Sequence, residues 1–196
     1  EDVVYKGNLK ASLYPDFADI FIIAVPTPFK EKGSEEDIPM PNIDFVLKAA
    51  SSIAPFLKSG NLVILESTSP VGTTEKVSKV ITDESNLSLE EFHICYCPER
   101  VLPGRIIHEL IFNDRVIGGI NKKSSEICKT FYSTFCKGNL KITSTRTAEM
   151  VKLSENAYRD VNIAFANELS MICSQLDIDV HELISISNQH PRVNIL

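Results

Sequence analysis

The sequence predicts an α/β protein: the C-terminal half of a doubly wound, Rossmann-like parallel sheet, followed by a long helix that opens an all-α dimerisation domain. Short apolar runs alternate with helical patterns as far as residue 144. Such alternation with short connections is typical of a parallel sheet covered by helices. From residue 145 onward the pattern is helical only. We therefore expect a partial α/β domain over residues 1–144 and an incomplete helical dimerisation domain over 145–196.

The strands are predicted from apolar runs bounded by turn residues, and the helices from apolar periodicity without Gly or Pro. The predicted strands are residues 18–25, 61–68, 92–97, 115–120 and 140–143. The predicted helices are residues 43–57, 73–81, 124–135, 147–173 and 180–188. Asn42 is expected to cap the first helix and Pro55 to kink its last turn, and Asp179 with Glu182 suggests a capping box for the last one. Residues 1–18 are expected to form a connector and 29–41 a loop.

The long predicted helix carries an unusual polar face. Lys152, Asn156 and Arg159 follow one another at i, i+4 and i+7, so a helix places all three on one side. A cation, an amide and a guanidinium together can bind a polyanionic ligand and stabilise a developing oxyanion. The ordinary alternative is a solvated face, with acidic neighbours as ion-pair partners: Glu149, Glu155 and Asp160.

Composition excludes several classes of function. The 196 residues are 43% hydrophobic and 23% charged, as in ordinary globular proteins, and the net charge of −6 argues against general nucleic-acid binding. No apolar run approaches the ~20 residues of a membrane span, so no membrane partner and a cytoplasmic location are expected. The five cysteines lack a framework spacing, which favours buried, reduced thiols and no metal site.

Three predicted strands end in polar or turn residues, at 25–28, 66–70 and 97–100. Each segment taken alone is commonly a stiff turn, a capping loop or a surface ion pair. Ligands of open α/β sheets bind outside the carboxyl ends of the strands, so three such segments at one edge favour a binding crevice. The sequence contains no Gly-x-Gly-x-x-Gly after a strand, no Gly-x-Ser-x-Gly and no Walker-type Gly-Lys-Thr.

Taken together, these segments resemble the UDP-glucose/GDP-mannose dehydrogenase family, over almost the whole chain from about residue 18. Pro-Glu-Arg followed by Leu-Pro-Gly resembles the branch that acts on N-acetylated sugars. The segments that carry the resemblance are AVPTPF (24–29), LESTSPVGT (65–73), YCPERVLPG (96–104), NDRVIGG (113–119), RTAEM (146–150), NIAFANE (162–168) and HPRVN (190–194).

The resemblance implies a reaction. Family members use two NAD⁺ to oxidise the 6-hydroxymethyl group of a nucleotide sugar to a carboxylate, through an aldehyde that a cysteine traps as a thiohemiacetal. The expected substrate is UDP-N-acetyl-D-mannosamine, for surface polysaccharide synthesis, and residues 1–144 become a partial NAD-binding domain. A homodimer through the long helix is the expected assembly.

The resemblance also implies roles for single residues. Thr27 and Thr68 stand where the family contacts NAD. Lys152 and Asn156 match the pair that stabilises the oxyanion and holds the water, and Glu99 matches a nearby carboxylate. The expected substrate-binding residues are Arg100, Val101, Lys152, Asn156, Arg159, His190 and Arg192. The His190–Arg192 loop is expected to reach across the dimer interface.

The family's Gly-rich phosphate loop and its nucleophilic cysteine segment are not found in this sequence. The sequence is therefore expected to be the middle of a longer enzyme and inactive alone. Three alternatives stay open: a truncated, non-catalytic dimerising protein; the same chemistry on UDP-N-acetylglucosamine; and a β-hydroxyacid-type dehydrogenase, against which the Pro-Glu-Arg and His-Pro-Arg segments argue.

Overall fold

The computed structural model describes residues 2–31, 34, 38–102 and 104–196. Part of the predicted 29–41 loop and Pro103 of the Leu-Pro-Gly segment lie outside these residues. The described chain divides into two compact units, residues 1–150 and 151–196. The predicted boundary at 144/145 remains a prediction.

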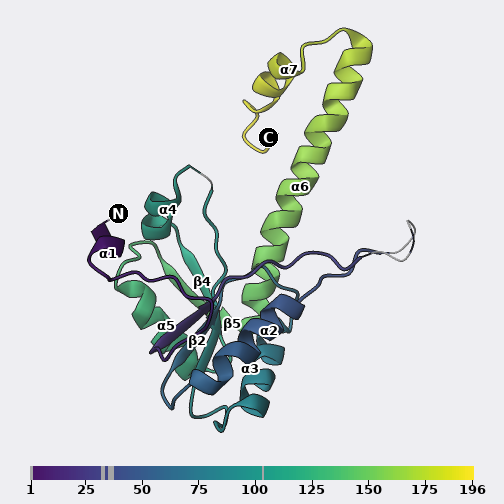
Figure 1. Cartoon of the computed structure of the whole chain (residues 1–196). Coiled ribbons are helices and arrows are strands. Elements are labelled where there is room, and N and C mark those ends of the chain that lie inside the picture. The colour runs from purple at the N-terminus through teal and green to yellow at the C-terminus, as the bar shows by residue number, and fades with distance from the viewer. Residues whose placement is uncertain (1, 32–33, 35–37, 103) are drawn as a thin grey trace. The chain divides into compact units, whose positions relative to one another are not determined.

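The first unit is built on a five-stranded sheet in the order β1-β2-β3-β4-β5, which confirms the α/β prediction (Figure 1). Its strands are β1 (Ile20–Ile23), β2 (Leu62–Leu65), β3 (His93–Tyr96), β4 (Arg115–Gly119) and β5 (Leu140–Ser144). The pairs β1–β2, β2–β3 and β4–β5 are parallel, and β3–β4 is antiparallel. The carboxyl ends of β1, β2 and β3 therefore meet at one edge, as the sequence predicts.

Successive side chains of β2 and β3 enter two different cores. Val63 and Leu65 pack into the core that α2 and α3 cover, whereas Leu62 and Ile64 pack toward α5. Both faces of these strands are buried, as expected for apolar runs without alternation. The prediction of full burial is wrong for β1, where Ile22 is 47% exposed. Among the described strands, β1 pairs only with β2 and lies at the edge of the sheet.

The helices follow the predicted segments with shifted ends. They are α2 (Asp44–Ile53), α3 (Thr73–Glu84), α5 (Lys122–Ser133), α6 (Thr145–Leu176) and α7 (Val180–Ser187). After α2 the chain continues as the 3-10 turn η1 (Ala54–Phe56). This turn contains Pro55, which was expected to distort the end of the helix. Asn42 lies one residue before the cap position, and its side chain accepts a hydrogen bond from the Asp44 N–H at 2.9 Å. Two short helices were not predicted: α1 (Asp2–Tyr5) and α4 (Ile106–Phe112).

All five cysteines are buried and unpaired, as predicted. Cys95, Cys97 and Cys128 lie together in the core between the sheet and α5. Burial raises the pKa of the Cys97 thiol to about 12, so that thiol stays protonated near neutral pH. These thiols are built into the core as small apolar side chains.

Candidate active site

Hydrogen bonds join the ends of β1 and β2. The Ser67 hydroxyl accepts a hydrogen bond from the Val25 N–H at 2.8 Å and donates to the Val25 carbonyl at 2.8 Å. The Thr27 hydroxyl donates to the Thr68 carbonyl at 2.7 Å. The two threonines predicted to contact NAD therefore lie side by side. Ser67 was missed by sequence reasoning, although it lies inside the Ser-Thr-Ser signal.

The segment after β3 is folded around the side chain of Glu99. This carboxylate accepts hydrogen bonds from the backbone N–H groups of Arg100 and Val101, at 2.5 and 2.6 Å. The Arg100 guanidinium donates to the carbonyl of Asp114 at 2.9 Å. Three residues predicted for catalysis or substrate binding are thus in one tight turn, which the Glu99 carboxylate stabilises.

A cluster of polar side chains, in which Tyr132 and Arg115 are buried and Glu66 is half-buried, lies next to these strand ends. The sequence did not reveal it. The Tyr132 hydroxyl of α5 donates to the Glu66 carboxylate at 2.5 Å. The Arg115 guanidinium lies 3.9 Å from the same carboxylate oxygen and 4.4 Å from the centre of the Tyr132 ring. Burial raises the pKa of Glu66 above its ordinary value, against the opposing effects of Tyr132 and Arg115. The cluster links α5 and β4 to the residue that precedes Ser67.

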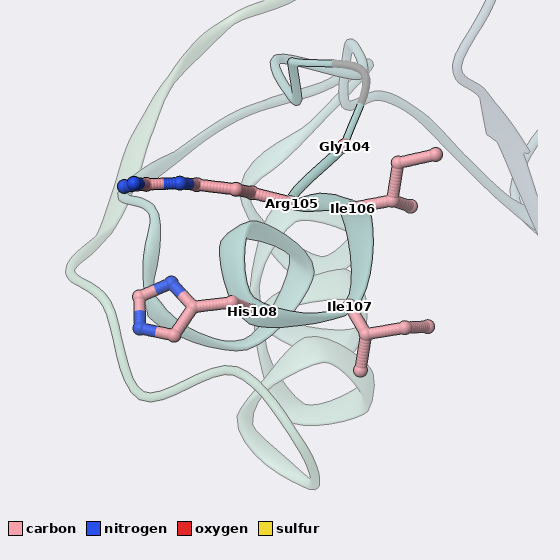
Figure 2. Close-up of a pocket in the computed structure, with 5 residues that line it drawn as sticks. All are labelled: Gly104, Arg105, Ile106, Ile107 and His108. Carbon is pink, nitrogen blue, oxygen red and sulfur yellow. The ribbon is translucent and has the colours of Figure 1, made fainter.

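Beyond the Glu99 turn lies an open pocket of about 580 Å³ at the start of α4. Its lining includes Gly104, Arg105, Ile106, Ile107 and His108. Figure 2 shows Arg105 and His108 extending to one side of the helix, while Ile106 and Ile107 extend to the other. The pocket combines cationic and apolar surface directly after the turn that carries Arg100 and Val101.

The remaining predicted site residues belong to the second unit. Lys152, Asn156 and Arg159 all lie on α6 and keep the helical spacing that places them on one face. His190 and Arg192 lie in a loop after α7, where the Arg192 N–H donates to His190 Nδ1 at 3.3 Å. The Asn188 side chain closes this loop by accepting from the Ile195 N–H at 2.7 Å and donating to the Ile195 carbonyl at 2.9 Å.

One part of the alternative interpretation of α6 is wrong. Glu149 was considered as an ion-pair partner on a solvated face, but its residue is fully buried. Its carboxylate accepts hydrogen bonds from residues at the start of α3. Its position one turn before Lys152 gives no hint of this burial, because the partner lies far away in the sequence.

The described residues contain no group of three or more His, Cys, Asp or Glu side chains placed to hold a metal ion. In the same part of the chain, no helix has the length and apolarity needed to cross a membrane.

The sequence matches two profiles of one family. Residues 1–136 match the profile of the UDP-glucose/GDP-mannose dehydrogenase family, NAD binding domain, and residues 146–196 match that of the family's central domain. The chain is 54% identical to a UDP-N-acetyl-D-mannosamine dehydrogenase of Campylobacter jejuni, over 99% of this chain and 48% of that protein. It is 50% identical to an NDP-N-acetyl-D-galactosaminuronic acid dehydrogenase of Ralstonia solanacearum, over 98% of this chain and 46% of that protein. The chain thus spans about half the length of these curated relatives.

Solved structures agree with these matches. A UDP-D-ManNAc dehydrogenase from Pyrococcus horikoshii superimposes with a TM-score of 0.88 at 40% identity, over 100% of this chain and 46% of that one. The UDP-N-acetyl-mannosamine dehydrogenase Cap5O from Staphylococcus aureus gives a TM-score of 0.87 at 47% identity, over 100% of this chain and 47% of that one. The NAD-binding profile confirms the predicted cofactor class. The chain belongs to the UDP-glucose/GDP-mannose dehydrogenase family.

Proposed function

We propose that the protein to which this chain belongs is an NAD-dependent dehydrogenase of UDP-N-acetyl-D-mannosamine. The observation that carries the proposal is the 54% identity to a UDP-N-acetyl-D-mannosamine dehydrogenase over 99% of this chain. The proposed reaction converts the 6-hydroxymethyl group, two NAD⁺ and one water into a carboxylate, two NADH and three protons. A role in surface polysaccharide synthesis follows from the uronic acid product and belongs to the same proposal.

The geometry at the strand ends fits a dinucleotide. Thr27 and Thr68 lie partly buried at the carboxyl ends of adjacent parallel strands, where open α/β sheets bind their ligands. NAD, when bound, supplies the hydride acceptor. This chain's contribution there is to orient the cofactor, with the Ser67 hydrogen bonds holding the two strand ends together.

The catalytic roles proposed for the other residues follow from their chemistry. The Lys152 ammonium and the Asn156 amide can donate to the oxygen that gains negative charge as hydride leaves, and Lys152 can also transfer a proton. Glu99 can orient the water that completes the oxidation. The guanidinium groups of Arg100, Arg159 and Arg192 suit pyrophosphate oxygens because each can donate two parallel hydrogen bonds. Val101 and His190 complete the proposed sugar-nucleotide contacts.

The cysteine chemistry of the family needs a reactive thiolate. All five thiols of this chain are buried, and burial raises the pKa of Cys97 to about 12. We therefore assign none of them as the nucleophile.

The test is the amount of NADH formed per UDP-N-acetyl-D-mannosamine consumed, by the natural polypeptide that contains this chain. Two NADH per sugar support the proposal. Turnover only with the N-acetylglucosamine or the N-acetylgalactosamine nucleotide would keep the proposed chemistry and correct the sugar. The N-acetylgalactosamine nucleotide is included because one relative is an NDP-N-acetyl-D-galactosaminuronic acid dehydrogenase. No NADH with any of them would leave the non-catalytic, dimerising alternative.

Replacing the proposed proton-transfer group tests its role in the same assay. Lys152→Ala should lower kcat by roughly 10²–10⁴-fold, the usual contribution of general acid–base catalysis. Lys129→Ala removes an exposed lysine of α5 and should leave kcat within about twofold, since surface changes away from the site are usually small. Equal rates for the two variants would contradict the role assigned to Lys152.

A further inference from the structure

A buried carboxylate fastens the start of α6 to the start of α3. Glu149 Oε2 accepts a hydrogen bond from the Gly72 N–H at 2.6 Å. Glu149 Oε1 accepts from the Thr74 N–H at 2.8 Å and from the Thr74 hydroxyl at 2.7 Å. The residue is fully buried, and all these atoms belong to the first unit.

These contacts give hydrogen-bond acceptors to backbone N–H groups at the N-terminus of α3. The first N–H groups of a helix have no partner within the helix and carry partial positive charge, so a carboxylate there is favourable. Gly72, at the N-cap position, offers no side chain for this purpose. Glu149 supplies the cap from a distant segment. The capped helix directly follows the segment of Ser67 and Thr68.

Two further contacts hold the same turn of α6. A Cβ atom added to Gly118 of β4 would lie 2.8 Å from the Ala148 Cβ and 2.6 Å from the Ser144 carbonyl oxygen, so the turn packs directly on the β4 backbone. The Arg146 guanidinium binds the Glu75 carboxylate of α3 with two bonds, of 2.7 and 2.8 Å. This ion pair is exposed to solvent and contributes little compared with the buried contacts.

We propose that Glu149 is a positioning residue for the dehydrogenase reaction. By joining the start of α6 to the start of α3, it fixes the turn from which the Lys152-bearing helix continues, relative to the segment that carries Thr68. Displacing a catalytic group by about 1 Å can lower a rate by roughly 10²-fold, which gives such an anchor a kinetic consequence. This inference rests on the proposed function.

Glu149→Gln is the informative variant, because glutamine keeps the size of the side chain. The substitution removes the carboxylate charge. It also places the NH₂ group of glutamine, a donor, against a backbone N–H that is a donor too, so at least one hydrogen bond of the cap is lost. Val77→Ala is the matched control: Val77 is fully buried on α3 but makes no contribution to the cap, so its loss lowers Tm without cutting the anchor. Arg146→Ala removes only the exposed ion pair.

The kinetic experiment uses the natural polypeptide, at a temperature where all variants are folded. We expect Glu149→Gln to lower kcat by roughly tenfold or more, while KM for the sugar nucleotide stays within about twofold. Val77→Ala and Arg146→Ala should keep kcat within about twofold of the wild type. An equal loss of kcat in Val77→Ala at a similar loss of Tm would show that Glu149 acts through stability alone and would overturn the proposal.

Hydrogen exchange on the natural polypeptide tests the anchor without any activity. Glu149→Gln should speed amide exchange at Gly72, Thr74 and residues 146–150 more than Val77→Ala does. Equal exchange in the two variants would overturn the anchor itself. A wild-type enzyme without turnover would overturn the proposed function, and the kinetic role with it, whereas an active wild type with an unaffected Glu149→Gln would overturn this inference alone.

Discussion

At the level of single residues, two carboxylates, the half-buried Glu66 and the fully buried Glu149, organise the loops that carry the proposed site. Glu66 holds Tyr132 and approaches Arg115 beneath the ends of β2 and β3, and Glu149 caps α3. Replacing either by an apolar residue would leave buried donors without acceptors, which costs about 1–3 kcal/mol for each group left unpaired. The two differ in their partners: Glu66 has a hydroxyl and a nearby guanidinium, whereas Glu149 has backbone N–H groups as well as a hydroxyl.

Glu66 should make the stability of the first unit depend on pH. Because burial raises the pKa of Glu66 above its ordinary value of 4.5, its contribution is fully present below 4.5 and is lost as pH rises through the folded-state pKa. In Glu66→Gln the amide oxygen can still accept the hydrogen bond from Tyr132, but the side chain no longer titrates. As the pH rises through the folded-state pKa of Glu66, we therefore expect the free energy of unfolding to fall less in this variant than in the wild type. Urea unfolding at a series of pH values from 4 upward measures the difference.

The control for this prediction is Glu90→Gln, which changes an exposed glutamate in the loop before β3. Its free energy of unfolding should follow the wild type across the same series. Parallel curves for Glu66→Gln and the wild type would show that Glu66 ionises in the folded protein as it does in the unfolded chain.

At the level of helices and strands, local chemistry was predictable and tertiary placement was not. The long helix was expected over 147–173 and runs from Thr145 to Leu176, because its sequence contains no Gly or Pro to stop it. The α4 helix was missed because its seven residues make less than two helical turns, too few for their apolar periodicity to distinguish a helix from a loop. The antiparallel β3–β4 pair was missed because strand direction depends on the path of the connection, which the apolar runs do not encode.

The capping of α7 is a local feature that can be tested directly. Asp179 accepts hydrogen bonds from the His181 N–H at 2.8 Å and the Glu182 N–H at 3.4 Å. Asp179→Ala should therefore destabilise α7 by about 1 kcal/mol. Faster amide exchange within Val180–Ser187 would report this loss. Gln175→Ala, an exposed change near the end of α6, should leave that exchange unaltered, and equal exchange in both variants would rule out the cap.

At the level of the whole molecule, the candidate site divides into residues that the sequence revealed and residues that only the structure revealed. Thr27, Thr68 and Glu99 lie in compact motifs at strand ends, so they could be found from the sequence. Ser67 and Glu149 act on partners 42 and 75 residues away or more, and no local pattern encodes such a distance. Motifs therefore located the proposed chemistry, whereas the contacts that hold the motifs in place needed the fold.

The second unit presents an apolar stripe that fits the predicted homodimer. Tyr158, Val161, Phe165 and Ile172 follow one another at i, i+3, i+7 and i+14 on α6, which places them along one side of the helix. Each is at least half exposed, at 65%, 67%, 51% and 50%. Contiguous exposed apolar surface of this kind marks protein–protein interfaces. A second copy of the chain is the partner that the sequence predicted.

Val161→Asp should therefore convert a dimer of the 21.8 kDa chain into a monomer. A carboxylate at the centre of an apolar contact loses its hydration without gaining a partner, at an effective cost of several kcal/mol. Light scattering coupled to size-exclusion chromatography at micromolar concentrations measures the mass. Asn167→Asp adds the same charge on the other side of α6 and should stay dimeric, because its side chain points away from the stripe. A monomeric wild type, or a Val161→Asp variant as dimeric as Asn167→Asp, would exclude this stripe as the dimer contact.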